Sequence, residues 1–137
     1  MSMYARYVPT HFVAQTWPQC EKYVAEAMPH GNGDYTLDQI KMFVHIGQWS
    51  LIVIVDDADV IHGALTVSYI NYPNDRIAFV TFIGGKHITN DDTFKQVCDI
   101  LRANGATKTQ CMARPSAARL WQRCGYENRA ALLEMKL

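Results

Sequence analysis

The chain has 137 residues, the length of one ordinary domain and too short for two domains that each bury a core. Its composition is 49% hydrophobic and only 19% charged, which excludes an intrinsically disordered chain. Thirteen Lys and Arg balance thirteen Asp and Glu, so no global field favours nucleic acid, and we expect no nucleic-acid partner.

The sequence also bears on location and on metals. The longest near-continuous apolar run, residues 51–55, is far shorter than the roughly 20 residues of a membrane-spanning helix, so no membrane span is expected. The N-terminus lacks a basic patch followed by an apolar stretch, which predicts a cytoplasmic protein. The four cysteines form no C-x-x-C pair and are expected to be reduced and buried. No histidine has a metal-ligand spacing to another histidine or a cysteine, so no metal site is predicted.

The first third of the chain predicts a strand and then two helices. Residues 3–8 alternate in the manner of a strand before a proline ends it. A first helix is expected with Thr16 as its cap and Pro18 in its first turn. Thr36 and Gln39 form the pattern of a capping box, which predicts the start of the second helix.

The middle of the chain predicts a β-hairpin and one further strand. Two runs with strand character, residues 49–55 and 60–72, flank the acidic segment at residues 56–59, whose aspartates are expected to form a solvated turn. The next strand, RIAFVTFI, covers residues 76–83 and leads into Gly84 and Gly85.

The last third predicts a helix, a strand, a short helix and a final strand. Thr89 or Asn90 is the expected cap of the first of these elements, which Gly105 should end. The three later elements are expected at residues 107–112, 116–123 and 131–137. In the final segment, Leu and Met alternate with Glu and Lys, the period of a strand with one apolar face.

A pattern near the C-terminus is known from one family. Residues 114–126 read RPSAARLWQRCGY, which resembles the motif N-x-x-A-x-x-L-Y-x-x-x-G-F of the GNAT superfamily of N-acetyltransferases. The residues that match by identity or type are Ala117, Leu120, Gly125 and Tyr126. With the order of elements, the resemblance covers essentially the whole chain. It implies one α/β (α+β) domain over residues 1–137, a GNAT-like mixed sheet of about six or seven strands with about four helices on both faces.

The resemblance also implies where a cofactor would bind. The family holds acetyl-CoA between its fourth and fifth strands, with the pyrophosphate on the third helix, where free backbone N–H groups attract an anion. The corresponding candidates are Gly84, Gly85, Lys86, His87, Thr89 and Asn90. The glycines do not fit the family signature Q/R-x-x-G-x-G/A. Asp91 and Asp92 add two carboxylates to the first turn, where they would repel a diphosphate.

The catalytic pattern of the family is incomplete as well. Trp121 stands where many of these enzymes have the tyrosine that protonates the leaving thiolate, and an indole N–H does not release a proton near neutral pH. The fourth strand contains no carboxylate that could act as a base. Nearby substitutes are Tyr69, Tyr72, His62 and His87, of which His87 is kept as a candidate catalytic residue.

Two functions from different classes follow. The first is a GNAT-fold protein with a degenerate acetyl-CoA site that binds another protein and needs no cofactor. It resembles short virion or assembly proteins of tailed bacteriophages, which implies a virion or host protein as partner, in the host cytoplasm or the virion. The second is an acetyl-CoA-dependent N-acetyltransferase of a small amine or a protein amine, since attack by a free amine requires chiefly proximity. A plain small-molecule binder on this fold is a third interpretation.

Overall fold

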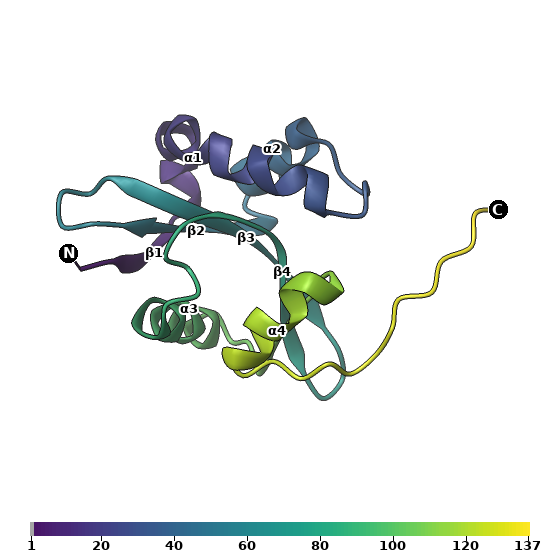
Figure 1. Cartoon of the computed structure of the whole chain (residues 1–137). Coiled ribbons are helices and arrows are strands. Elements are labelled where there is room, and N and C mark those ends of the chain that lie inside the picture. The colour runs from purple at the N-terminus through teal and green to yellow at the C-terminus, as the bar shows by residue number, and fades with distance from the viewer. Residues whose placement is uncertain (1) are drawn as a thin grey trace.

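In the computed structural model, which describes residues 2–137, a mixed sheet lies between two pairs of helices (Figure 1). Helices α1 (Val13–Ala27) and α2 (Leu37–His45) cover one face, and α3 (Asp91–Ala103) and α4 (Pro115–Arg123) lie on the other. The strands are β1 (Tyr4–Val8), β2 (Trp49–Val55), β3 (Ile61–Asn71), β4 (Arg76–Gly85) and β5 (Lys108–Cys111). The expected α+β class and the helices on both faces are therefore confirmed.

The five strands follow one another across the sheet in chain order, from β1 to β5. The first three pairs are antiparallel, and β4 pairs with β5 in parallel through the crossover helix α3. The predicted hairpin of residues 49–72 is confirmed as β2 and β3. Within residues 2–137 the sheet has five strands, fewer than the six or seven expected.

The missing strand is the one predicted at residues 131–137. This segment is extended but has no strand assignment, and it projects away from the body (Figure 1). A strand exists only when a neighbouring strand satisfies its backbone N–H and C=O groups. Alternation of side chains predicts the extended backbone but cannot supply this neighbour, so the prediction of a strand is wrong for the single chain.

Helix α1 starts earlier than predicted. A short 3-10 turn, Thr10–Phe12, leads directly into α1 at Val13, so Thr16 and Pro18 lie inside the helix. The Thr16 hydroxyl donates to the Phe12 carbonyl oxygen (2.9 Å) instead of capping a helix end. The buried stripe of the helix, which includes Trp17 at 2% exposure, outweighs the single hydrogen bond that Pro18 cannot donate. A second 3-10 turn, Met28–His30, follows the helix.

The core forms two apolar clusters, one on each face of the sheet, and β2 contributes to both. Leu51, Val53 and Val55 pack toward α1 and α2, while Ile52 and Ile54 pack toward α3. This division follows from the alternation of side chains across a strand. Because both faces are covered, β2 reads in the sequence as a continuous apolar run.

The two predicted helix caps have different outcomes. In α2 the capping box is confirmed, since the Gln39 backbone N–H donates to the Thr36 hydroxyl and the Thr36 backbone N–H donates to the Gln39 side chain. In α3 the residue at the N-cap is Asn90, but its side chain makes no capping hydrogen bond. It points instead to His87, so neither Thr89 nor Asn90 acts as the expected side-chain cap.

No helix in the described part of the chain is both long and apolar enough for a membrane crossing.

Candidate functional site

The candidate site is the opening that forms where β4 and β5 separate. The two strands pair only over Ile77–Val80 and Lys108–Cys111, and β4 then continues to Gly85 without β5. At the same place the β3–β4 ladder contains a bulge: Val67 faces Val80 and Thr66 faces Phe82, so Thr81 is the extra residue. A bulge bends its strand and increases the local twist. The bulge at Thr81 therefore directs β4 away from β5.

Hydroxyl groups stabilise this bulge from inside the sheet. The Thr81 hydroxyl donates to the backbone carbonyl oxygen of Thr66 (3.0 Å), and the two hydroxyl oxygens lie 2.7 Å apart. Thr66 is fully buried, so its carbonyl would lose a partner if the Thr81 hydroxyl were absent. The sequence analysis missed this pair, because a threonine in a strand is an ordinary residue and carries no signal of a bulge.

On the α1 and α2 side, residues 29–32 cross the opening, and we call this segment the strap. The Arg114 guanidinium donates to the Pro29 carbonyl oxygen (2.8 Å), and the Asn32 amide lies 3.2 Å from the Met112 sulfur. These contacts join the chain that follows α1 to the chain that follows β5. Arg114, which replaces the asparagine of the family motif, thus bonds the strap to the chain that follows β5.

On the α3 and α4 side, three aromatic rings pack together. Phe94 of α3 lies 6.2 Å from Trp121 and 6.0 Å from Tyr126, and the last two are 5.7 Å apart, measured between ring centroids. The Tyr126 hydroxyl lies 3.0 Å from the Thr109 hydroxyl of β5, and burial raises the pKa of Tyr126. We call these three residues the aromatic cluster. It gives Trp121 a packing role between the two helices.

The two glycines at the end of β4 are placed in tight packing. A Cβ atom added to Gly84 would lie 1.9 Å from the backbone oxygen of Tyr23 in α1. One added to Gly85, which has a φ of +92°, would lie 2.4 Å from the backbone oxygen of His62. The close approach of α1 and β3 therefore accounts for both glycines, whether or not a phosphate binds there.

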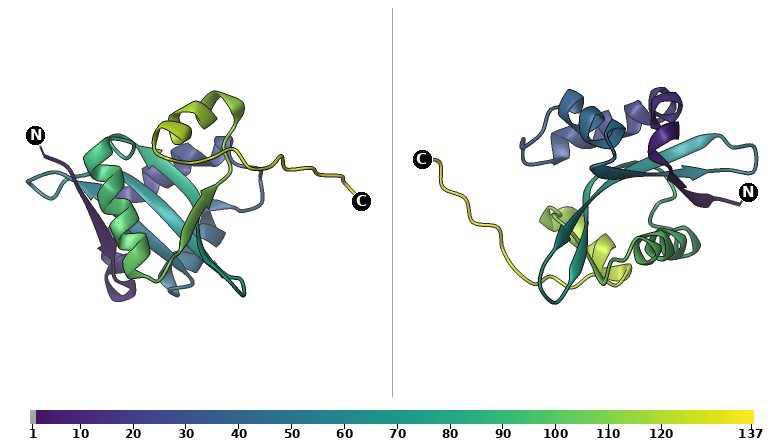
Figure 2. Two further views of the ribbon diagram at one scale, coloured as in Figure 1. Left: turned by 90° about the horizontal axis from the view of Figure 1, so that it is seen from below. Right: turned by 180° about the vertical axis from the view of Figure 1, so that it is seen from behind.

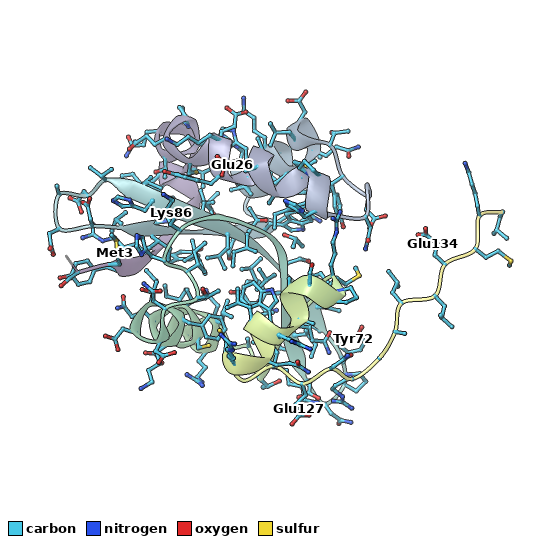
Figure 3. The ribbon with its side chains drawn as sticks, in the orientation of Figure 1. Met3, Glu26, Tyr72, Lys86, Glu127 and Glu134 are labelled. Atoms are coloured by element: carbon cyan, nitrogen blue, oxygen red, sulfur yellow. The ribbon has the colours of Figure 1, made fainter. Side chains whose placement is uncertain are left out.

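The remaining candidates form the turn between β4 and α3. The Lys86 backbone N–H donates to the His62 carbonyl oxygen (2.9 Å), and the Lys86 side chain is exposed (Figure 3). His87 has a φ of +71°, unusual for a residue with a side chain, and its ring nitrogen lies 3.3 Å from the Asn90 amide. The Thr89 carbonyl oxygen accepts a long hydrogen bond from the thiol of Cys124, at 4.0 Å, so the end of α4 rests against this turn.

His87 also lies beside a pair of titratable groups that the sequence did not connect. Its ring centroid is 6.0 Å from that of His62, whose Nε2 lies 2.8 Å from a carboxylate oxygen of Asp56. Asp56 accepts two backbone N–H groups as well, and these bonds, the His62 bond foremost, lower its pKa. Asp56 is therefore buried rather than solvated as expected, whereas Asp57 and Asp59 are exposed.

The other candidate proton carriers do not meet at the bulge. Tyr69 faces Ala78 in the β3–β4 ladder, and its hydroxyl accepts from the Asn104 amide (3.1 Å). Tyr72 is exposed just beyond the end of β3, while His62 and His87 lie at the other end of β4. The structure therefore brings two of the four candidates together, His62 and His87, and leaves the tyrosines apart from them.

Two shallow hollows flank α3. One, of about 390 Å³, lies between α3 and the end of α4 and includes Cys98 and Cys124 in its lining. The other, of about 780 Å³, lies between β1 and the first turn of α3, where Asp91 and Asp92 line it.

All four cysteines are free, and burial raises the pKa of Cys111 to about 11. Across residues 2–137 no group of three His, Cys, Asp or Glu side chains is placed to hold a metal ion.

Comparison with known proteins shows which solved structures have a similar fold. No family model matches the sequence, and the search of curated proteins finds no match. Solved structures do match. An aminoglycoside acetyltransferase from an uncultured soil metagenomic sample, in complex with sisomicin, is similar with a TM-score of 0.70 and 8% identity, over 98% of this chain and 96% of that one. The chain has the GNAT fold.

Two further structures with the GNAT fold show the same likeness. Glucosamine-6-phosphate N-acetyltransferase from Arabidopsis thaliana has a TM-score of 0.64 and 11% identity, over 99% of both chains. A predicted acetyltransferase from Clostridium acetobutylicum, solved with acetyl-CoA, has a TM-score of 0.64 and 9% identity, over 98% of this chain and 96% of that one. At these identities the likeness establishes the fold, and the residues decide the function.

The residues at the start of α3 fit acetyl-CoA poorly. A diphosphate on this helix end needs free backbone N–H groups and no competing anion. Here Asp91 and Asp92 are exposed carboxylates in the first turn, and Cys124 rests on the Thr89 carbonyl beside it. Lys86 and the two histidines bring donor or cationic groups to the same turn, but Gly84 and Gly85 are held in packing with α1 and β3.

Proposed function

We propose that this GNAT-fold protein has a degenerate acetyl-CoA site and acts by binding another protein. The observation that carries the proposal is the aromatic cluster. Trp121, at the position of the family's proton-donating tyrosine, packs against Phe94 and Tyr126 between α3 and α4. An indole there provides packing and no usable acid.

Three further features support this proposal independently of Trp121. Asp91 and Asp92 oppose a diphosphate at the start of α3. Gly84 and Gly85 pack directly against the backbone of α1 and β3, which accounts for these glycines without a bound phosphate. On the opposite side of the sheet, the strap is bonded across the opening through Arg114. A domain that transferred acyl groups would need one side open to the coenzyme and the other to the amine.

A role as a virion or assembly protein of bacteriophage type is the finer part of this proposal. It rests on an analogy with short phage proteins that have a degenerate domain of this fold. A virion or host protein would then be the partner, and the host cytoplasm or the virion the location. A balanced net charge of +0 and the apolar C-terminal residues fit a protein partner better than nucleic acid.

The second candidate function is an acetyl-CoA-dependent N-acetyltransferase. The observation in its favour is the opening itself: β4 separates from β5 at a bulge, as an acyl carrier between the strands would require. The similar structures include acetyltransferases of glucosamine-6-phosphate and of aminoglycosides, so a small amine is the acceptor this candidate would take.

Isothermal titration with acetyl-CoA and with CoA separates the two functions. For the proposed function we expect no heat of binding at millimolar ligand, and no release of free thiol when acetyl-CoA is mixed with a panel of amino sugars and peptide amines. Micromolar binding, or thiol release above the rate without protein, would overturn it.

A matched set of variants identifies what blocks the site. Asp91→Asn with Asp92→Asn removes the charge at the start of α3, and Trp121→Tyr restores the family's residue. We expect neither to create acyl transfer alone, since each leaves the other obstacle in place. Asp34→Asn, in an exposed loop, is the control for the loss of negative charge. If Trp121→Tyr alone produced transfer, the proposal of a degenerate acetyl-CoA site would be wrong.

A further inference from the structure

The charges of the chain are unevenly distributed along its length. Residues 1–99 contain eleven Asp and Glu against six Lys and Arg. Residues 100–126, which include β5 and α4, contain five Lys and Arg and no Asp or Glu. The formal net charge of +0 therefore results from one basic segment that offsets an acidic remainder.

Three of the five cations in this segment already have a partner. Arg102 and Lys108 each pair with an aspartate, and the Arg114 guanidinium donates to a backbone carbonyl of the strap. Arg119 and Arg123 of α4 are exposed. Within residues 2–137 neither of these two side chains has an ion pair. The positive charge that is not compensated inside the domain is therefore concentrated on α4.

The two arginines lie on the outer face of α4. They are four residues apart, about one helical turn, so their side chains point to the same side. Trp121, midway between them, points to the opposite side and packs against Phe94. Leu120, which is 42% exposed, lies three residues before Arg123 and is its neighbour on the helix surface. Figure 2 shows α4 at the periphery of the molecule, on the same face of the sheet as α3. We call Arg119, Leu120 and Arg123 the basic face of α4.

The chemistry of the helix itself accounts for only one of these cations. Arg123 lies in the last turn, where a positive charge interacts favourably with the helix dipole. Arg119 lies in the middle of α4, and no acidic residue stands three or four positions from it. Like charges at this spacing repel and destabilise a helix. A negatively charged group from outside the domain would remove this repulsion.

The basic face is also short. Its C-terminal end adjoins the start of α3, since the Cys124 thiol donates to the Thr89 carbonyl oxygen. Asp91 and Asp92 follow in the first turn of α3, and both are exposed. A long polyanion such as nucleic acid would extend from the arginines onto these carboxylates and be repelled. A segment with only two or three negative charges fits on α4 alone.

We infer that the basic face binds an acidic segment of the partner protein, with one carboxylate on each arginine and an apolar side chain on Leu120. This inference rests on the proposed function and adds the chemistry of the partner. A guanidinium binds a carboxylate through two parallel N–H donors. Arg119 and Arg123 are about 6 Å apart along the helix axis. Similar intervals separate residues i and i+4 of a helix and i and i+2 of a strand, so a short segment of either conformation can carry both carboxylates.

Fluorescence anisotropy tests the inference with a labelled peptide of three Glu-Ala-Leu-Glu repeats. We expect the full chain to bind it in the micromolar range, more weakly as salt is added, and not to bind the same peptide with Gln in place of Glu. Arg119→Glu with Arg123→Glu should weaken binding at least about tenfold, with unchanged circular dichroism. Lys22→Glu with Lys41→Glu, at exposed positions of α1 and α2, is the control with the same change of net charge. It should leave the affinity within about twofold, because these helices cover the other face of the sheet.

Two results of this titration would overturn the inference. One is the absence of binding at millimolar peptide, and the other is equal weakening by the two double variants. Neither depends on acetyl-CoA, so the calorimetric titration with acetyl-CoA decides the proposed function separately.

Amide chemical shifts identify where the peptide binds. We expect the largest changes in residues 115–125. Changes centred on the turn at residues 86–90 would place the peptide at the start of α3 and contradict the inference. Tighter binding of a twelve-nucleotide single-stranded DNA than of the peptide would do so as well. A chain that sediments as a dimer, and as a monomer with both arginines replaced, would show that a second copy covers this face and would overturn the assignment to a different partner.

Discussion

An interior strand of the sheet, β2, and its edge strand β5 differ in how completely they are covered. Around β2, six of the seven strand residues are buried, and α1 buries five residues against the sheet. Around β5, none of the four strand residues is buried, and α4 buries none of its nine. The first region is a fully packed core. The second lies at the surface, beside the edge of the sheet and the exposed apolar side chains of the C-terminal segment. Binding functions are therefore expected in the C-terminal third, and the stability of the domain in the rest.

The substitution expected to destabilise the buried region most severely is Gly84→Ala, at the contact between β4 and α1. Its Cβ atom would lie 1.9 Å from the Tyr23 backbone oxygen, and backbone cannot move aside as a flexible side chain can. We expect a loss of at least about 4 kcal/mol in the free energy of unfolding, or failure to fold. Urea unfolding followed by circular dichroism measures it. Gly33→Ala, at a positive φ with open space around it, should cost only about 1 kcal/mol. Equal losses for the two would show that α1 does not pin Gly84.

A pair of leucines compares the two regions directly. Leu65 in β3 is 1% exposed, and Leu120 in α4 is 42% exposed. Because truncation of a buried leucine removes apolar contacts and leaves a cavity, Leu65→Ala should cost about 3 kcal/mol. Leu120→Ala should cost less than about 0.5 kcal/mol, as is usual at the surface. A large loss for Leu120→Ala in urea titration would mean that α4 is covered in solution, by a partner or a second copy.

The boundary between the two regions is the bulge, and Thr81→Val tests how it is held. Valine keeps the shape but leaves the buried Thr66 carbonyl without the hydroxyl donor. We expect a loss of about 1 to 2 kcal/mol in the free energy of unfolding. Thr81→Ser retains the hydroxyl and should cost less. If the two variants were equally stable by chemical denaturation, the hydroxyl pair would not be what stabilises the bulge.

The smallest effect is expected at acid pH, from Asp56. The bonds from His62 and the backbone lower its pKa in the folded protein, so the stabilisation is present above the ordinary value of about 3.9 and is lost as the pH falls below it. Asp56→Asn should therefore be less stable than the wild type at pH 7 and lose less stability between pH 4 and pH 2. Asp34→Asn should follow the wild type at every pH. Thermal unfolding across this range measures the difference, and parallel curves for wild type and Asp56→Asn would contradict it.

Local patterns predicted the elements that local chemistry determines. The capping box of Thr36 and Gln39 and the β2–β3 hairpin are set within a few residues, and both are confirmed. The start of α1 was wrong because the preceding 3-10 turn and the burial of Val13 override the capping preference of Thr16. The family resemblance correctly indicated the fold, although the strand count was too high by the segment that lacks a partner.

The site itself depends on contacts that no short pattern encodes. The Thr66–Thr81 pair, the Asp56–His62 pair and the strap bond of Arg114 each join residues from different elements. The sequence indicated the mismatch of the glycines with the phosphate-binding signature, but the reason for them, the approach of Tyr23 to Gly84, exists only in three dimensions. The part that each candidate residue plays toward a ligand stays a prediction.

The location of the bulge has a consequence for how this architecture can evolve. The separation of β4 from β5 originates inside the β3–β4 ladder, at Thr81, and not in the loops that would recognise a coenzyme. Loop residues and catalytic groups can then be substituted without loss of the separation between β4 and β5. A protein of this fold that lost acyl transfer would still keep a bent β4 that is partly unpaired and available for other uses.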